Sequence, residues 1–143
     1  MSIEQNKAVV RRLYDDVFNG RRIELIDHLA VGDYLDHDPL PGQRDGRLGL
    51  GDKVSALVAG LDPRFTIEDV IAEGDRVAVR WINEGTHVAE FLGIPPTGRS
   101  FRFAGVDIYG MDGGMLAEHW HVVDQLTMLQ QLGLVPTPEG EPA

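Results

Sequence analysis

The 143-residue chain contains no cysteine, which excludes disulfide bonds, thiolate metal ligands and thiol catalysis. It has no apolar run near the roughly 18 residues of a membrane helix, and its first residues lack the hydrophobic stretch of a signal peptide. Basic residues are scarce, with 13 Lys and Arg against 23 Asp and Glu, a formal net charge of −10. Phosphate backbones repel so acidic a chain. We therefore expect a cytoplasmic protein that binds neither membranes nor nucleic acids.

The composition is that of a folded protein, with 43% apolar and 25% charged residues. This length can bury a core without disulfide bonds or structural metals. The chain shows no internal repeat and no linker. We expect a single domain over residues 1–134 and a flexible C-terminal tail over residues 135–143, which contain three prolines.

Helical periodicity dominates the first half of the chain. Apolar residues recur at helical spacing over residues 3–18, which predicts an amphipathic helix. Ser2 and Gln5 resemble a capping box, and Gly20 is a plausible end of this helix. Two further helices are expected over residues 23–29 and from about 50 to 61.

After Pro63 the periodicity changes from helix to strand. Strands are expected over residues 66–72, 77–86, 99–109 and 115–123, followed by a short helix over residues 125–132. Asp112, Gly113 and Gly114 suit a tight hairpin, whereas residues 87–98 read as a loop. Helices followed by antiparallel strands indicate an α+β fold. A curved antiparallel sheet that wraps over the helices would enclose a pocket.

The segment EHWHVVD is the most informative for function. Strand alternation places Glu118, Trp120 and Asp124 on one face, and His119 and His121 on the other. Carboxyl groups beside an indole are a candidate acid–base site, because burial raises a carboxyl pKa. We therefore expect the first face to line the pocket. Asp124 has an alternative interpretation as the N-cap of the following helix.

The same strand offers a histidine pair that could bind a metal. His119 and His121 lie two residues apart, and a third ligand would have to come from His37 or His87. Because such a pair is not specific, we favour an outer sheet face or a subunit contact for it. We expect no metal site.

Polar residues cluster in the segment YLDHDP. Proline favours an extended conformation at Asp38, so that this segment is an extended entry or a turn. Its polar residues lie either at a pocket edge or in a solvated loop: Tyr34, Asp36, His37 and Asp38. Further along, Arg80 lies within an apolar strand, either on its outer face or paired with a buried carboxylate such as Asp107.

Two further positions bear on the pocket. Asp107 shares a strand face with Phe103 and Tyr109, and an acid among aromatic residues is a pocket signal. His87 follows the end of a strand, where a hydrogen bond to the neighbouring loop is the common role.

Taken in order, YLDHDP, EGDRVAVRW, GTHVAEFLGIPPTGR, EHWHVVD and LTMLQQLG resemble the SnoaL-like polyketide cyclase family, named after nogalonic acid ester cyclase. The resemblance spans residues 3–133. It implies the fold of nuclear transport factor 2 and ketosteroid isomerase, a cone of helices over a strongly bent sheet. It also implies a pocket enzyme without metal or cofactor, which closes a ring by intramolecular aldol condensation with an aspartate as acid–base.

The resemblance also assigns roles to individual residues. By its place in the closing strand, Asp124 matches the acid–base aspartate. Asp107 and the polar residues of YLDHDP match positions that line the pocket in relatives. The residue after the strand tryptophan is often acidic in the family, whereas this chain has His121 there.

These considerations predict a cyclase that holds a small hydrophobic substrate. The expected catalytic residues are Asp124, Asp107, His37 and Arg80. The expected substrate-binding residues are Tyr34, Asp38, Trp81, His87, Phe103, Tyr109, Glu118 and Trp120. Asp124 would move the proton, and Arg80, His37 or Tyr34 would stabilise the enolate oxygen.

Other functions fit the same sequence. Arg80 between Asp107 and Asp124 would suit an epoxide hydrolase or isomerase, and pyran-forming or pericyclic cyclases share the fold. A hydrophobic-ligand-binding module without turnover is the third class. We also expect a homodimer, because three apolar residues would occupy the open side of the sheet: Ile82, Val106 and Ile108.

Overall fold

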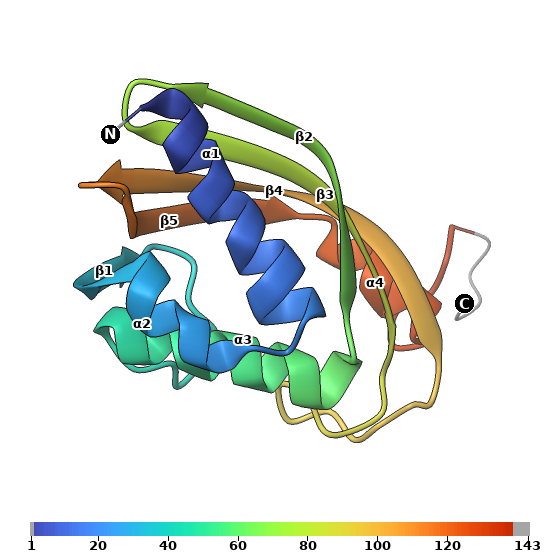
Figure 1. Cartoon of the computed structure of the whole chain (residues 1–143). Helices are drawn as coiled ribbons and strands as arrows, with labels where there is room; N and C mark the ends of the chain where they lie inside the picture. The colour runs from blue at the N-terminus through green and yellow to red at the C-terminus, as the bar shows by residue number, and fades with distance from the viewer. Residues whose placement is uncertain (1, 139–143) are drawn as a thin grey trace.

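The structure is a computed structural model that describes residues 2–138. Its elements are α1 (Ile3–Arg12), the π-helical η1 (Leu13–Asn19), the 3-10 helix η2 (Ile23–Leu25), α2 (Ile26–Leu29), β1 (Ala30–Asp36), α3 (Gly46–Leu61), β2 (Arg64–Glu73), β3 (Arg76–Thr86), β4 (Ser100–Asp112), β5 (Met115–Val123) and α4 (Gln125–Gln131). Helices pack on one curved, unclosed sheet, as Figure 1 shows, which confirms the predicted α+β class. Residues 139–143 of the expected tail lie outside the described residues.

The first helix continues from α1 directly into η1. It begins with the predicted capping box, since Ser2 Oγ accepts a hydrogen bond from the Gln5 N–H and Gln5 Oε1 accepts one from the Ser2 N–H, both at 3.1 Å. Gly20 caps its C-terminal end, as expected. π-helical turns are rare and often occur at functional sites. Here the π-helical turns carry Tyr14, whose side chain is buried under the sheet.

The five strands form one sheet in the order β1-β5-β4-β3-β2. Strands β2 to β5 are antiparallel neighbours, whereas the edge strand β1 pairs in parallel with β5. The expectation for this region, an extended segment or a turn, missed strand β1. No local pattern predicts this strand, because its partner β5 lies far along the chain.

The remaining elements lie close to their predicted positions. Strand β5 has the predicted bounds, and β2, β3 and β4 differ from theirs by at most three residues. Gly113 and Gly114 adopt positive φ angles of 57° and 82°, which confirms the hairpin. Helix α3 begins at Gly46, one turn earlier than predicted. The prediction missed this first turn because it contains two glycines and an exposed leucine and so lacks an apolar stripe.

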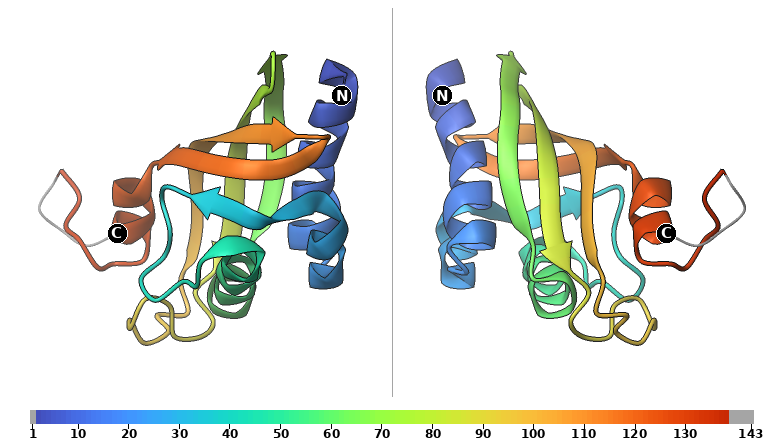
Figure 2. Two further views of the ribbon diagram at one scale, coloured as in Figure 1. Left: turned by 90° about the vertical axis from the view of Figure 1, so that its left-hand side faces the viewer. Right: turned by 90° about the vertical axis from the view of Figure 1, so that its right-hand side faces the viewer.

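The concave face of the sheet covers the helices. Figures 1 and 2 show the sheet bending over α1 and α3, with α4 at the end of β5. On β3 and β4 alternate residues face inward and are buried: Val77, Val79, Trp81, Asn83, Phe101, Phe103, Asp107 and Tyr109. Within residues 2–138, no helix combines the length and apolarity needed to cross a bilayer.

Two glycine substitutions test this packing with opposite signs. A Cβ on Gly85 would lie 2.3 Å from the Leu61 carbonyl oxygen, so Gly85→Ala is expected to lower the free energy of unfolding by about 1–3 kcal/mol. A Cβ on Gly51, in the helix α3, meets nothing within 4 Å, so Gly51→Ala should raise it by about 0.5–1 kcal/mol. Urea unfolding measures both. Equal effects of the two variants would contradict the packing.

Candidate active site

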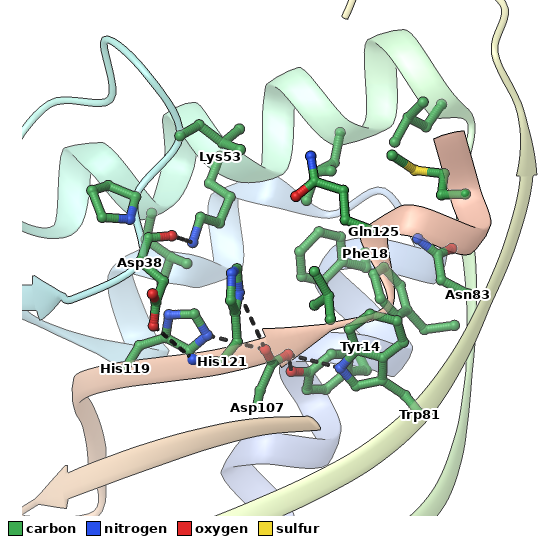
Figure 3. A pocket seen from close by; sticks show the side chains of 18 of the residues that line it. Tyr14, Phe18, Asp38, Lys53, Trp81, Asn83, Asp107, His119, His121 and Gln125 are labelled. Atoms are coloured by element: carbon green, nitrogen blue, oxygen red, sulfur yellow. Dashed lines mark hydrogen bonds and ion pairs between the residues drawn. The ribbon is translucent and has the colours of Figure 1, made fainter. Parts of the chain in front are cut away.

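A cavity of about 330 Å³ lies between the concave face of the sheet and the helices. Much of its wall is aromatic, as at Phe18, Phe65 and Phe103, while ionisable groups gather on one side (Figure 3). This volume is at the lower end of the range typical of ligand pockets. Five of the residues expected to bind substrate line the cavity: Tyr34, Asp38, Trp81, Phe103 and Tyr109.

Asp107 of β4 is the most heavily hydrogen-bonded group of the cavity. Its Oδ2 accepts hydrogen bonds from the Tyr14 hydroxyl and from Trp81 Nε1, the latter at 2.8 Å, and its Oδ1 lies 3.2 Å from His119 Nε2. Burial by itself raises the pKa of Asp107, but hydrogen bonding and the positive charge of His119 outweigh it and hold the pKa below 3.8. Asp107 is therefore a carboxylate at neutral pH.

His119 of β5 lies between two carboxylates. Its Nε2 faces Asp107, and its Nδ1 lies 2.8 Å from Asp36 Oδ1. Burial lowers the pKa of His119, but the hydrogen bonds to Asp107 and Asp36 raise it above 6.5 overall. Since both ring nitrogens face acceptors, His119 is an imidazolium that donates two hydrogen bonds.

Lys53 of α3 completes a buried chain of charges. Its Nζ lies 2.6 Å from Asp36 Oδ2 and 3.0 Å from the Asp38 carbonyl oxygen. Positive and negative groups thus alternate through Lys53, Asp36, His119 and Asp107, and the four charges cancel. Buried charges are tolerated when each is paired and hydrogen-bonded in this way.

His121 of β5 lines the cavity with an imidazole ring that is held less tightly than that of His119. Its half-buried ring lines the cavity, and its Nδ1 lies 3.6 Å from Asp107 Oδ1. Its backbone N–H donates to Asp38 Oδ2 at 2.9 Å, which fixes the strand at this point. Burial lowers the pKa of His121 below 6.5, and the charges of His119 and Lys53 lower it further against the opposing effect of Asp107. At neutral pH this imidazole is neutral and can accept a proton.

The face of β5 expected to line the pocket is the wrong one. The alternation is confirmed, but His119, His121 and Val123 line the cavity. On the opposite face, Trp120 stacks on His37 at 4.8 Å and carries the Arg76 guanidinium at 4.7 Å. Glu118 and Trp120 were expected to bind substrate, yet they lie outside the cavity. On this outer face the Trp120 indole packs against His37 and Arg76, and the Glu118 carboxylate pairs with the same two residues.

His37, an expected catalytic residue, also lies outside the cavity. Its Nε2 is 2.7 Å from Glu118 Oε2, and its ring covers the Trp120 indole. The residue therefore belongs to the outer cluster with Glu118 and Trp120.

Asp124 is the N-cap of α4, which confirms the alternative interpretation. Its carboxylate accepts hydrogen bonds from the Thr127 N–H at 3.2 Å and from Thr127 Oγ1 at 2.7 Å. The residue is exposed and does not line the cavity. Both carboxylate oxygens thus serve the helix end.

Two other expected residues also lie outside the cavity. Arg80 occupies the outer sheet face, where its Nε donates to Asp69 Oδ2 at 2.8 Å, so it does not pair with Asp107. The arrangement expected for an epoxide hydrolase is therefore not assembled. His87 is buried, and its Nδ1 accepts from the Thr97 N–H at 3.2 Å, which confirms a hydrogen bond to the loop.

One group of side chains could hold a metal ion. Ligand atoms of Asp107, His119 and His121 all lie within 4.8 Å of one another. Neither His37 nor His87 is the third ligand considered from the sequence. To bind a metal, His119 would have to give up its hydrogen bond to Asp107, next to the positive charge of Lys53.

Sequence reasoning missed Tyr14 and Lys53 as parts of the site. Both carry a usable signal, because each places a polar atom within the apolar stripe of its helix. Asp36 was part of the polar cluster in YLDHDP, but its contact with His119 could not be foreseen, because it depends on the unexpected pairing of β1 with β5.

The buried imidazolium predicts a specific pH dependence of stability. Because the folded-state pKa of His119 is raised, its contribution is fully present below pH 6.5 and is lost as the pH rises through the folded-state pKa. His119→Gln should lower the free energy of unfolding by about 3 kcal/mol at pH 6 and remove this decline. Urea unfolding from pH 5.5 to 9 measures both effects, with the exposed His28→Gln as control. The same decline in both variants would contradict the assignment.

Comparisons with known proteins agree with this geometry. The family model for SnoaL-like polyketide cyclase matches residues 8–132. TsrD from Streptomyces laurentii superposes with a TM-score of 0.86 at 25% identity, over 94% of this chain and 99% of that chain. IdmH from Streptomyces antibioticus, a proposed polyketide cyclase, superposes with a TM-score of 0.77 at 32% identity, over 90% of this chain and 99% of that chain. No curated protein matches.

A further solved structure extends this likeness beyond the streptomycetes. A proposed polyketide cyclase from Acidithiobacillus ferrooxidans gives a TM-score of 0.78 at 30% identity, over 92% of this chain and 97% of that chain. The bent sheet, the cavity beneath it and the family match over most of the sequence lead to one assignment. The chain belongs to the SnoaL-like polyketide cyclase family.

Proposed function

We propose that this protein is an acid–base enzyme in which His121 moves a proton to and from a small, mostly apolar carbonyl compound. The observation that carries the proposal is an imidazole that lines a mostly apolar cavity, with its Nδ1 3.6 Å from the hydrogen-bonded carboxylate of Asp107 and its pKa lowered by burial. A base with a pKa somewhat below neutrality is present in its active form at pH 7. The family match supports ring closure of the aldol type without a cofactor as the overall reaction.

Asp107 is the positioning group for His121 in this mechanism. Its Oδ1 faces His121 Nδ1, so the Nδ1–H can donate toward the carboxylate and leave Nε2 as the base. The imidazolium that forms when Nε2 takes a proton is stabilised by the same carboxylate. Tyr14 and Trp81 hold the carboxylate in place. The hydrogen bond tightens when substrate excludes water, since such contacts are often long in free enzymes.

The ring closure then needs two events at the polar side of the cavity. His121 removes a proton from the carbon next to a carbonyl, and the enolate oxygen lies near the ammonium of Lys53. Two of the Lys53 N–H groups are taken by Asp36 and the Asp38 carbonyl, which leaves the third to donate. The enolate carbon attacks a second carbonyl carbon of the same molecule, and the resulting alkoxide takes the proton back from His121. Atoms and charges balance without a co-reactant.

The departure of His121 from the family pattern bears directly on the proposed mechanism. This residue follows the strand tryptophan, at a position where the family resemblance leads us to expect an acid. Because the position faces the cavity, the proton-transfer group changes from a carboxylate to an imidazole. The acid–base role expected for Asp124 is thus reassigned to His121.

A simple ketone tests the proton-transfer step even though the substrate is unidentified. In D₂O the enzyme should catalyse deuterium exchange at the carbon next to the carbonyl of 1-tetralone, measured by NMR. His121→Phe should lower the exchange rate by about 10²- to 10⁴-fold. The rate should rise with pH to a plateau, with a midpoint below 6.5 because the pKa of His121 is lowered. His28→Phe is the control on an exposed histidine.

Asp124→Asn separates this mechanism from the one expected from the sequence. The variant should keep the exchange rate, because Asn also caps helices. Loss of exchange in Asp124→Asn with full exchange in His121→Phe would overturn the assignment. No exchange above background in the wild type would favour a ligand-binding module.

We also propose that two copies associate through the outer face of the sheet. This face presents exposed apolar side chains, with Val122 at 79%, Ile71 at 66% and Ile108 at 39% exposure. Ile82 and Val106, also expected there, are half-buried on the same face. Exposed apolar patches of this kind mark association surfaces.

Light scattering at micromolar concentration tests the association. The wild type should have the mass of a dimer and Val122→Lys that of a monomer, because a buried unpaired ammonium opposes association. Leu48→Lys, at a 63% exposed position of α3, should leave the dimer intact. A monomeric wild type, or a dimeric Val122→Lys, would refute the proposal.

A further inference from the structure

Asn83 of β3 is a polar residue in an apolar part of the cavity. Its side chain is only 1% exposed, and its Oδ1 has no hydrogen-bond partner among the described residues. Within residues 2–138, three buried side-chain atoms share this property, the others being Asn6 Oδ1 and His87 Nε2. Of these three residues, Asn83 alone lines the cavity. A buried polar atom without a partner requires an explanation, because nearly all such atoms are paired in native proteins.

The surroundings of Asn83 do not supply that explanation. Its neighbours across the sheet are Phe65 on β2 and Phe103 on β4. Leu61 and Met128 contribute apolar lining to the cavity from the helices. The strand holds Asn83 through its backbone and needs no amide side chain there. Leucine has nearly the same volume and would avoid the desolvation of an unpaired amide.

Asn83 lies away from the ionisable groups. Figure 3 shows it at the opposite end of the cavity from Lys53, Asp38 and His119, with Phe18 and Trp81 between them. A molecule that fills the cavity therefore meets polar groups at both ends, with aromatic side chains and the amide of Gln125 between them.

We propose that Asn83 is a specificity-determining subsite that binds a hydroxyl group of the substrate, at the end remote from the reacting carbonyl. The unpaired Oδ1 requires a donor, which excludes a second carbonyl as its partner. A hydroxyl both donates and accepts, so it pairs with either atom of the amide. The substrate class is thus a compact apolar ring compound with a carbonyl at one end and a hydroxyl at the other. The assignment of the carbonyl end rests on the proposed function.

Two probes that differ by one hydroxyl test this subsite. 6-Hydroxy-1-tetralone carries its hydroxyl on the far side of the ring system from the carbonyl, and 1-tetralone lacks it. In calorimetric titrations the wild type should bind the hydroxylated probe about tenfold more tightly. Asn83→Leu should abolish this ratio, because the leucine cannot accept the hydroxyl proton.

The thermal midpoint separates a binding role from a structural one. If the amide serves a ligand, Asn83→Leu should raise the Tm of the free protein by about 3 °C, since the unpaired amide disfavours the folded state. An amide held by a buried water or by the fold would give a lower Tm on replacement. Asn6→Leu is the matched control, because its buried Oδ1 also lacks a partner but lies outside the cavity. It should leave the binding ratio unchanged.

The ratio of the two binding constants tests the Asn83 subsite, whereas deuterium exchange tests His121, so the two proposals can fail independently. His121→Phe should lose exchange and keep the tenfold ratio, so a failure of the proposed chemistry leaves the subsite standing. Equal or undetectable binding of the two probes by the wild type would overturn the subsite. Retention of the ratio in Asn83→Leu, or a lower Tm of that variant, would overturn it as well.

Discussion

The site depends on a buried chain of four charges that runs through Lys53, Asp36, His119 and Asp107. Each member would be costly to bury alone, and each is tolerated because its neighbours have the opposite sign. The chain joins α3, β1, β5 and β4, so the same contacts that position the carboxylate also tie the edge strand to the sheet and the helix to both. Stability and the geometry of the site therefore share one set of interactions.

This arrangement gives two neighbouring histidines opposite protonation states. His119 has a carboxylate within hydrogen-bond distance of each ring nitrogen and stays protonated. Asp107 lies farther from the ring of His121, where burial and the charges of His119 and Lys53 outweigh the opposing effects of Asp107 and Asp38 on the pKa. A proton that is held between two carboxylates is poorly suited to catalysis. A neutral imidazole at the cavity surface is better suited, because it can accept a proton at neutral pH. The proposed mechanism therefore gives the proton transfer to His121.

The sequence predicted what depends on local patterns and failed where distant segments decide. The first helix and its Ser2 cap, β5 and the Gly113 turn follow from periodicity and turn chemistry within a few residues. The parallel pairing of β1 could not be predicted locally. It sets Asp36 beside His119 and so helps decide which face of β5 turns inward. Alternation divides a strand into two faces without saying which face is buried. Asp124 resembled a catalytic acid because the face with Glu118 and Trp120 was expected to line the pocket.

The protonation states of the two histidines test the account most directly. Imidazole ¹⁵N chemical shifts, followed by NMR from pH 5 to 9 and assigned with His119→Gln and His121→Phe, report each ring separately. The account predicts that His119 remains an imidazolium at pH 7 while His121 is neutral, with titration midpoints above and below 6.5 respectively. A neutral His119 together with a protonated His121 at pH 7 would contradict it.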